Sequence, residues 1–166
     1  MNSPKSEFLS LALLAFKKEI LKKRGYDLSS ANSINFGRLV PQVVYYVSAY
    51  CDLVNAGEIN MGDKISFSVP CGNFGNILAG YYAKEMGLPV EKLICASNEN
   101  NVLTDFIKTG IYDKCRQFKT TISPSMDILI SSNLERLLYF VCGPEKCAKY
   151  MEELKTTGKY TLEKNE

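Results

Sequence analysis

Histidine is absent from the 166 residues of this chain, and its absence removes several kinds of chemistry. A Ser-His-Asp triad, a Cys-His pair and a histidine general base are all excluded within the chain. The six cysteines contain no C-x-x-C pair, so we expect no metal site. Any chemistry must therefore come from a cofactor, a lysine or carboxylates.

Strong charge and long apolar runs are missing as well. The net charge is +2, which gives no electrostatic case for binding nucleic acid or a membrane surface. No apolar run is long enough to span a bilayer, and the short apolar stretch 9–16 lacks the flanks of a signal peptide. The scattered cysteines suit buried thiols in a reducing compartment, so a cytoplasmic location is expected.

Hydrophobic periodicity predicts alternating helices and strands. Helices are expected over 4–24, 34–55, 76–86, 101–109, 133–141 and 143–154, and strands over 65–69 and 93–96. In the helix 34–55, spacings of four and three predict a buried face of Phe36, Val40, Val43, Val47, Tyr50 and Val54. Ser132-Asn133-Leu134-Glu135 is typical of a capping box. The strand–helix–strand unit over 65–96 predicts parallel pairing, and hence an α/β fold.

The most informative segment is the turn between the strand 65–69 and the helix that follows it. Gly72 and Gly75 would let the main chain approach an anion and adopt positive φ. The helix that opens near Asn76 adds unpaired N–H groups and the positive end of a helix dipole. The turn is neither a P-loop nor a dinucleotide fingerprint. Taken alone, it fits an ordinary loop as well as a phosphate site.

Five segments of the chain resemble threonine synthase, in the family's order and with similar gaps, from about Asp27 to Phe140. These segments are 30–42, 69–84, 96–103, 123–128 and 131–138. Five ordered matches are far more specific than one glycine turn. The chain therefore resembles an inner-domain fragment of that family.

The resemblance implies the fold-type II class of pyridoxal-phosphate enzymes, here as a three-layer α/β/α arrangement with a short parallel sheet flanked by helices. It also implies the conversion of O-phospho-L-homoserine and water to L-threonine and phosphate, with pyridoxal 5′-phosphate as cofactor. The cofactor phosphate is then expected on Gly72, Asn73, Phe74, Gly75 and Asn76, where the asparagine amides could add donors. Cys71 departs from the family, which has Thr or Ser there, and a thiol is a weaker donor.

The substrate side of the cleft is expected at Asn32, Ser33, Asn35 and Arg38. Arg38 would suit a bidentate hold on a phosphate or carboxylate. Helix capping by Ser33 or Asn32, and a surface ion pair at Arg38, explain these residues equally well. Weaker candidates are Asn98, Glu99 and Asn100, which turn chemistry also explains.

The family's cofactor-binding lysine lies in a Phe-Lys-Asp-like motif upstream of the turn, and this sequence contains no such motif. That lysine forms the Schiff base, so we expect this chain to be inactive alone. We predict one α/β domain over 1–156, a frayed polar tail over 157–166, and the remaining domains of a parent enzyme as partners. A non-catalytic module that binds a phosphate ligand, or a purely structural domain, is the alternative.

Overall fold

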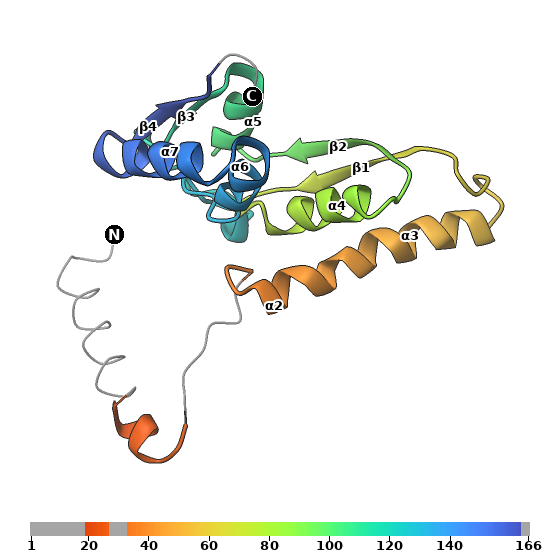
Figure 1. Ribbon diagram of the computed structural model, residues 1–166, viewed down its shortest axis with the longest axis horizontal. Coiled ribbons are helices and arrows are strands. Elements are labelled where there is room, and N and C mark those ends of the chain that lie inside the picture. Colours follow the sequence, from red (N-terminus) through yellow and green to blue (C-terminus); the bar gives the residue numbers. More distant parts are fainter. Residues whose placement is uncertain (1–18, 27–32, 164–166) are drawn as a thin grey trace. The chain divides into compact units, whose positions relative to one another are not determined.

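The computed structural model describes residues 19–26 and 33–163 (Figure 1). The chain divides into two compact units, Met1–Ala31 and Asn32–Glu166, which are considered separately. In the first unit, residues 19–23 are helical and Gly25 follows with φ 79°. The described end of the predicted helix 4–24 is thereby confirmed, while the start of this helix lies outside the described residues.

The second unit opens with a helix that is interrupted rather than continuous. An α-helical turn, α2 (Phe36–Leu39), leads into a 3₁₀ turn, η1 (Val40–Gln42), and then into α3 (Val43–Asn55). Pro41 lies in the 3₁₀ turn, where its missing N–H interrupts the α-helical hydrogen bonds. The single helix predicted over 34–55 is therefore wrong in its first third.

The buried face of this segment also differs from the predicted one. The buried side chains are Leu39, Val43, Tyr46 and Tyr50. Val43 and Tyr50 were predicted, but Phe36 is 56% exposed and Val47 is 41% exposed. The sequence carries apolar residues at helical spacing on two adjoining faces. The 3₁₀ turn, with three residues per turn, shifts the phase between α2 and α3.

The predicted strand–helix–strand unit is confirmed. It consists of β1 (Ile65–Pro70), α4 (Gly75–Glu85) and β2 (Val90–Ala96), and the two strands pair in parallel with Val69 opposite Cys95. Figure 1 shows α4 lying along these strands, with α3 beyond it. α3 and α4 approach each other closely at Gly80, where an added Cβ would lie 2.7 Å from the Tyr46 ring. The mixed α/β fold with a short parallel sheet agrees with the predicted fold class.

The rest of the unit adds three helices and a second pair of strands. These elements are α5 (Val102–Thr109), β3 (Ile111–Asp113), η2 (Pro124–Met126), α6 (Leu134–Cys142), α7 (Pro144–Thr156) and β4 (Lys159–Thr161). The helices were predicted to within two residues at each end, except that η2 was not foreseen. The antiparallel pair of β3 with β4 was also not predicted, because three-residue strands carry almost no periodic signal.

The strand β4 differs from the frayed polar tail predicted over 157–166, of which residues 164–166 lie outside the described residues. Tyr160 is only 3% exposed, and its ring stacks on Tyr112 with centroids 5.3 Å apart. One buried aromatic in an otherwise polar segment is enough to fix that segment against the core. The extent of the predicted single domain over 1–156 stays a prediction.

Within residues 19–26 and 33–163, no helix combines the length and the apolar character needed to cross a membrane.

Candidate functional site

The glycine-containing turn joins β1 directly to α4, as the sequence indicated. Its backbone differs from the expected one, because the positive φ belongs to Phe74 and not to Gly72 or Gly75. Phe74 is the N-cap of α4, with φ 62° and ψ 6°, and its side chain is only 6% exposed. A left-handed residue other than glycine costs about 1–3 kcal/mol and is common at ligand sites.

The two glycines are required for space rather than for their dihedral angles. A Cβ on Gly72 would lie 3.0 Å from the Met126 Cα, and one on Gly75 would lie 2.7 Å from the Ser33 Oγ. The contact at Gly75 is closer than real Cβ atoms come to other heavy atoms, and the contact at Gly72 is tighter than nearly all that they make. The glycines thus allow η2 and the segment before α2 to close over the turn.

Three consecutive residues before and at the start of α6 bind the acceptors of the turn. Ser131 Oγ donates to the Gly72 carbonyl at 2.5 Å. The Ser132 amide and hydroxyl both donate to Asn73 Oδ1, at 2.8 and 2.5 Å. The Asn133 amide and Nδ2 donate to the Asn73 carbonyl, at 3.3 and 3.1 Å. Protein donors therefore satisfy these oxygens and fix the orientation of the turn.

The opposite side of the turn offers N–H groups. The first hydrogen bond of α4 runs from the Leu78 amide to the Phe74 carbonyl, so the amides of Gly75 and Asn76 have no carbonyl acceptor inside the helix. The helix dipole adds positive potential at the same end. A cavity of about 180 Å³ lies here, lined by Ser33, Ser125, Met126 and residues 70–76. This combination of size, donors and dipole suits a phosphate group.

The two asparagine side chains of the turn are oriented by protein donors. Asn73 Oδ1 accepts from Ser132, and Asn76 Oδ1 accepts from the Tyr46 hydroxyl, which also lies 2.9 Å from the Asn76 carbonyl. Burial, together with the nearby Cys71, raises the pKa of Tyr46, so its hydroxyl stays protonated as a donor. With both amide oxygens engaged, the remaining polar group of each side chain is an N–H donor. The expectation that these asparagines add donors remains a prediction.

The expected substrate-side residues do not all lie at the cavity. Ser33 lines it and accepts a 3.1 Å hydrogen bond from Asn133 Nδ2. Asn35 instead caps α2 by accepting from the Gly37 amide at 3.0 Å, so this cap is formed by Asn35 and not by Ser33, one of the two residues considered for it. Arg38 is exposed in the last turn of α2 and does not line the cavity. Asn32 lies outside the described residues.

The polar loop after β2 binds protein rather than the cavity. Asp127 accepts hydrogen bonds from Asn98 Nδ2 at 2.7 Å, from Asn100 Nδ2 at 3.1 Å, and from the amide and hydroxyl of Thr121, both at 2.8 Å. These bonds, led by the Thr121 amide, lower the pKa of Asp127. The network holds the loop that carries Ser125 and Met126 against Gly72. These hydrogen bonds support the structural explanation of Asn98 and Asn100, and a contact of these residues with a ligand stays a prediction.

Sequence reasoning missed the part that Ser131, Ser132 and Asn133 play. The capping box predicted there is wrong, because Asn133 is the N-cap of α6 and the Ser132 hydroxyl points to Asn73. Asn133 is fully buried, which is unusual for an amide and signals a polar network. The motif was visible in the sequence, but its partner, 59 residues away, was not.

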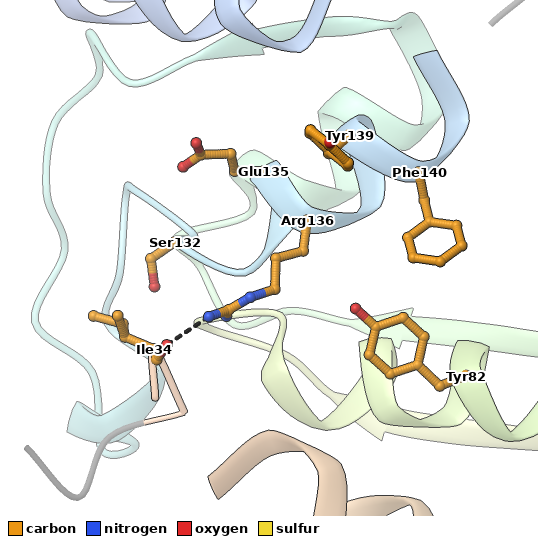
Figure 2. Close-up of a pocket in the computed structure, with 7 residues that line it drawn as sticks. All are labelled: Ile34, Tyr82, Ser132, Glu135, Arg136, Tyr139 and Phe140. Carbon is orange, nitrogen blue, oxygen red and sulfur yellow. Dashed lines mark hydrogen bonds between the residues drawn. The ribbon is translucent and has the colours of Figure 1, made fainter. Parts of the chain in front are cut away.

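A second, larger cavity of about 420 Å³ lies beside α6 (Figure 2). Arg136 crosses it to donate to the Ile34 carbonyl at 2.5 Å and the Ser33 carbonyl at 3.3 Å, and it also contacts Asn133 Oδ1. The aromatic walls, Tyr139 and Phe140, are 56% and 65% exposed. The Arg136 guanidinium is thus occupied in joining α6 to residues 33–34, so the smaller cavity is the better candidate for an anion site.

The sequence and the fold of the chain are similar to those of threonine synthases and of a protein named after them. The chain is 60% identical over 131 residues to "Threonine synthase-like 1" from Homo sapiens, which covers 78% of this chain and 17% of that protein. It is 42% identical over 151 residues to threonine synthase from Saccharomyces cerevisiae, covering 84% of this chain and 29% of that enzyme. The crystal structure of a PLP-bound threonine synthase from Brucella melitensis matches with a TM-score of 0.74 at 45% identity, over 82% of this chain and 29% of that one.

No family model matches the chain. The chain spans less than a third of the length of each of these relatives.

Proposed function

Since this chain belongs to the threonine synthase family, we propose that its turn, residues 72–76, holds the phosphate of pyridoxal 5′-phosphate. One observation carries this proposal. The acceptors of Gly72 and Asn73 are bound by Ser131, Ser132 and Asn133, while Gly75 and Asn76, whose amides have no acceptor inside α4, line a small cavity. A site whose acceptors are occupied and whose helix-start amides are left over favours an anion.

The residues present fit a phosphate group. Glycine at 72 and 75 allows the close packing that shapes the cavity, and an added Cβ at either position would meet protein atoms at 3.0 Å or less. Cys71 at the entrance contributes a weaker donor than the hydroxyl of its relatives would. Its thiol lies 3.2 Å from the Val69 carbonyl and also accepts a hydrogen bond from the Ile77 amide, so it is engaged by protein groups. We therefore assign the phosphate contacts to main-chain amides.

The reaction we propose for the parent enzyme is the conversion of O-phospho-L-homoserine and water to L-threonine and phosphate. The bound cofactor supplies an electron sink for that chemistry. The part of this chain is to bind and orient the cofactor through its phosphate, with Ser33 on the substrate side of the same cavity. Asn32, Asn35 and Arg38 remain proposed substrate-side residues, for which the cavity lining gives no support.

We also propose that this chain does not catalyse the reaction by itself. The sequence has no Phe-Lys-Asp motif to supply the lysine that binds the cofactor covalently. Its partners would then be the remaining domains of a parent enzyme. Six free cysteines suit a reducing compartment, which supports the cytoplasm as its location.

The test compares two ligands that differ only in the phosphate. We expect pyridoxal 5′-phosphate to raise the melting temperature of the chain, because a ligand that binds the folded state stabilises it. Pyridoxal should raise it far less. Gly75→Ala should lower the affinity for pyridoxal 5′-phosphate by about tenfold or more, since an added Cβ must displace Ser33. Gly37→Ala is the control, because its Cβ would meet only Asn35 Oδ1, at 3.3 Å.

Equal binding of the two ligands, unaffected by Gly75→Ala, would rule out the phosphate site. Formation of threonine from O-phospho-L-homoserine by the purified chain would refute the proposed inactivity.

A further inference from the structure

Two cysteine thiols meet beside the phosphate turn, at the ends of the parallel strands. Val69 pairs with Cys95, and the Cys71 amide donates to the Ala96 carbonyl at 2.8 Å. The Cys71 sulfur lies 3.2 Å from the Val69 carbonyl, so its side chain points back along β1 to the level of Cys95. The two thiols share a side-chain hydrogen bond, and neither is in a disulfide.

We propose that Cys71 and Cys95 are a redox modification site, where an oxidant closes a disulfide that displaces the start of the phosphate turn. The pair is not part of the phosphate contacts assigned above. The formation of the disulfide is independent of the proposed function, whereas its effect on a ligand rests on that function.

The two thiols differ in the way that a stepwise oxidation needs. Cys95 is half-buried, whereas Cys71 is only 5% exposed, so a reagent reaches Cys95 first. The hydrogen bond from Cys71, assisted by Ser97, lowers the pKa of Cys95 and increases its thiolate fraction. The hydrogen bond with Cys95, followed by burial, raises the pKa of Cys71, which keeps its proton until the second step.

The oxidant we name is a small-molecule disulfide, oxidised glutathione. The Cys95 thiolate attacks one of its sulfurs, the S–S bond breaks, and one glutathione thiolate leaves. Cys71 then attacks the Cys95 sulfur and displaces the second glutathione thiolate. Two protein thiols are oxidised to one disulfide, the reagent is reduced to two thiols, and the protons of the cysteines end on those thiols.

Closing this bond must move the turn. Parallel strands lie about 4.8 Å apart and rise about 3.3 Å per residue, so a residue offset by two positions from its partner has its Cα about 8 Å away. A disulfide needs less than about 7 Å, so Cys71 is drawn toward β2. The Cys71 sulfur also accepts a hydrogen bond from the Ile77 amide in the first turn of α4. Oxidation therefore removes an acceptor from the helix start and shifts the residue that precedes Gly72.

The experiment treats the full chain with oxidised glutathione and maps the products by mass spectrometry. Trypsin places Cys71 in the peptide 65–84 and Cys95 in the peptide 93–108, so the disulfide joins these two peptides. Hydrogen exchange of the Ile77 amide should become about threefold faster or more in the oxidised chain, because it has lost a hydrogen bond. Dithiothreitol should reverse both changes.

Variants separate the two steps. In Cys71→Ser, Cys95 should hold glutathione as a stable mixed disulfide, and in Cys95→Ser the cross-link should be lost and the peptide 65–84 should stay unmodified. The double variant Cys142→Ser, Cys147→Ser is the matched control and should keep the cross-link. A mixed disulfide that persists on Cys95 of the unmodified chain, a cross-link between other cysteines, or unchanged exchange at Ile77 would each overturn the proposal.

Pyridoxal 5′-phosphate gives a separate measurement. Its affinity should fall by about tenfold on oxidation. If the reduced chain does not bind it, the proposed function fails, and the peptide map still decides whether the disulfide forms.

Discussion

Two regions of this unit are held together in opposite ways. The turn region, residues 71–76 with 131–133, consists of directional hydrogen bonds between main chain and side chains that lie far apart in sequence. The aromatic cluster, Phe106, Tyr112, Tyr150 and Tyr160, consists of rings packed face to face and edge to face. The rings Tyr112 and Tyr160 are stacked at 5.3 Å, with an angle of 3° between their planes.

The difference separates stability from site geometry. Apolar burial is non-directional and scales with area, so the aromatic cluster stabilises the fold without fixing any particular atom at the cavity. Hydrogen bonds contribute little net free energy but specify positions, so the turn region sets where the amide donors point. The two regions meet at Tyr112, whose ring is in the cluster and whose hydroxyl accepts from the Ser131 amide at 2.9 Å and donates to the Leu129 carbonyl at 3.0 Å.

The largest effect is expected from removing a ring of the cluster. Tyr160→Ala should lower the free energy of unfolding by about 3–5 kcal/mol, because it leaves a cavity between Tyr112, Tyr150 and Phe106. Urea denaturation followed by circular dichroism measures this change. Tyr139→Ala is the control. Because Tyr139 is 56% exposed, this substitution should lower the free energy of unfolding by less than about 1 kcal/mol. A loss at Tyr160 no larger than at Tyr139 would show that β4 does not pack against the cluster in solution.

A smaller loss of stability, with a larger effect on the site, is expected for the turn region. Asn133→Ala removes the donor to the Asn73 carbonyl and one of the three acceptors of the half-buried Arg136, so the free energy of unfolding should fall by about 1–3 kcal/mol. Binding of pyridoxal 5′-phosphate should weaken further than that loss of stability explains, because the turn is no longer oriented. Isothermal titration at a temperature where both proteins are folded makes this comparison.

Asn60→Ala serves as the matched control for Asn133→Ala. Asn60 is exposed, and its side chain donates only to Asp63, at 3.2 Å, in the loop after α3. Its removal should leave ligand affinity unchanged. If Asn133→Ala also leaves affinity unchanged, the turn holds its shape without α6 and the proposed division between the two regions is wrong.

The sequence predicted those parts of the structure that depend on local patterns, and it missed those that depend on contacts between distant residues. Helices and the parallel strands were found because their apolar periodicity is local, as at Val102, Leu103 and Phe106 in α5. The turn was found because glycines between a strand and a helix form a local pattern, although this pattern alone fitted an ordinary loop equally well. The strands β3 and β4 were missed because each is three residues long and its partner is nearly fifty residues away.

The candidate site was predicted less completely than the fold, for a physical reason. The glycines at 72 and 75 were identified, but the cause given for them was partly wrong, since Phe74 takes the positive φ and the glycines provide space for Met126 and Ser33. The roles of Ser131, Ser132 and Asn133 depend on contacts across about sixty residues. A single sequence contains no signal for such contacts beyond the presence of small polar side chains.

The smallest effect is expected at Asp127, which joins the loop over the turn to the end of β2. Because hydrogen bonds lower the pKa of this carboxyl in the folded chain, it contributes stability that is present above its unfolded value, near 4. That contribution is lost as the pH falls through the lower folded value. Asp127→Asn should therefore leave the urea midpoint less dependent on pH between 6 and about 3 than in the unmodified chain. It should not remove the dependence, because the pKa of Asp113, bonded to Lys159, is also lowered.

Asp52→Asn, at an exposed position of α3, is the control. If the urea midpoint fell with pH in the same way in all three proteins, the Asp127 carboxylate would not hold the 121–127 loop. Met126 would then be held against Gly72 by packing alone.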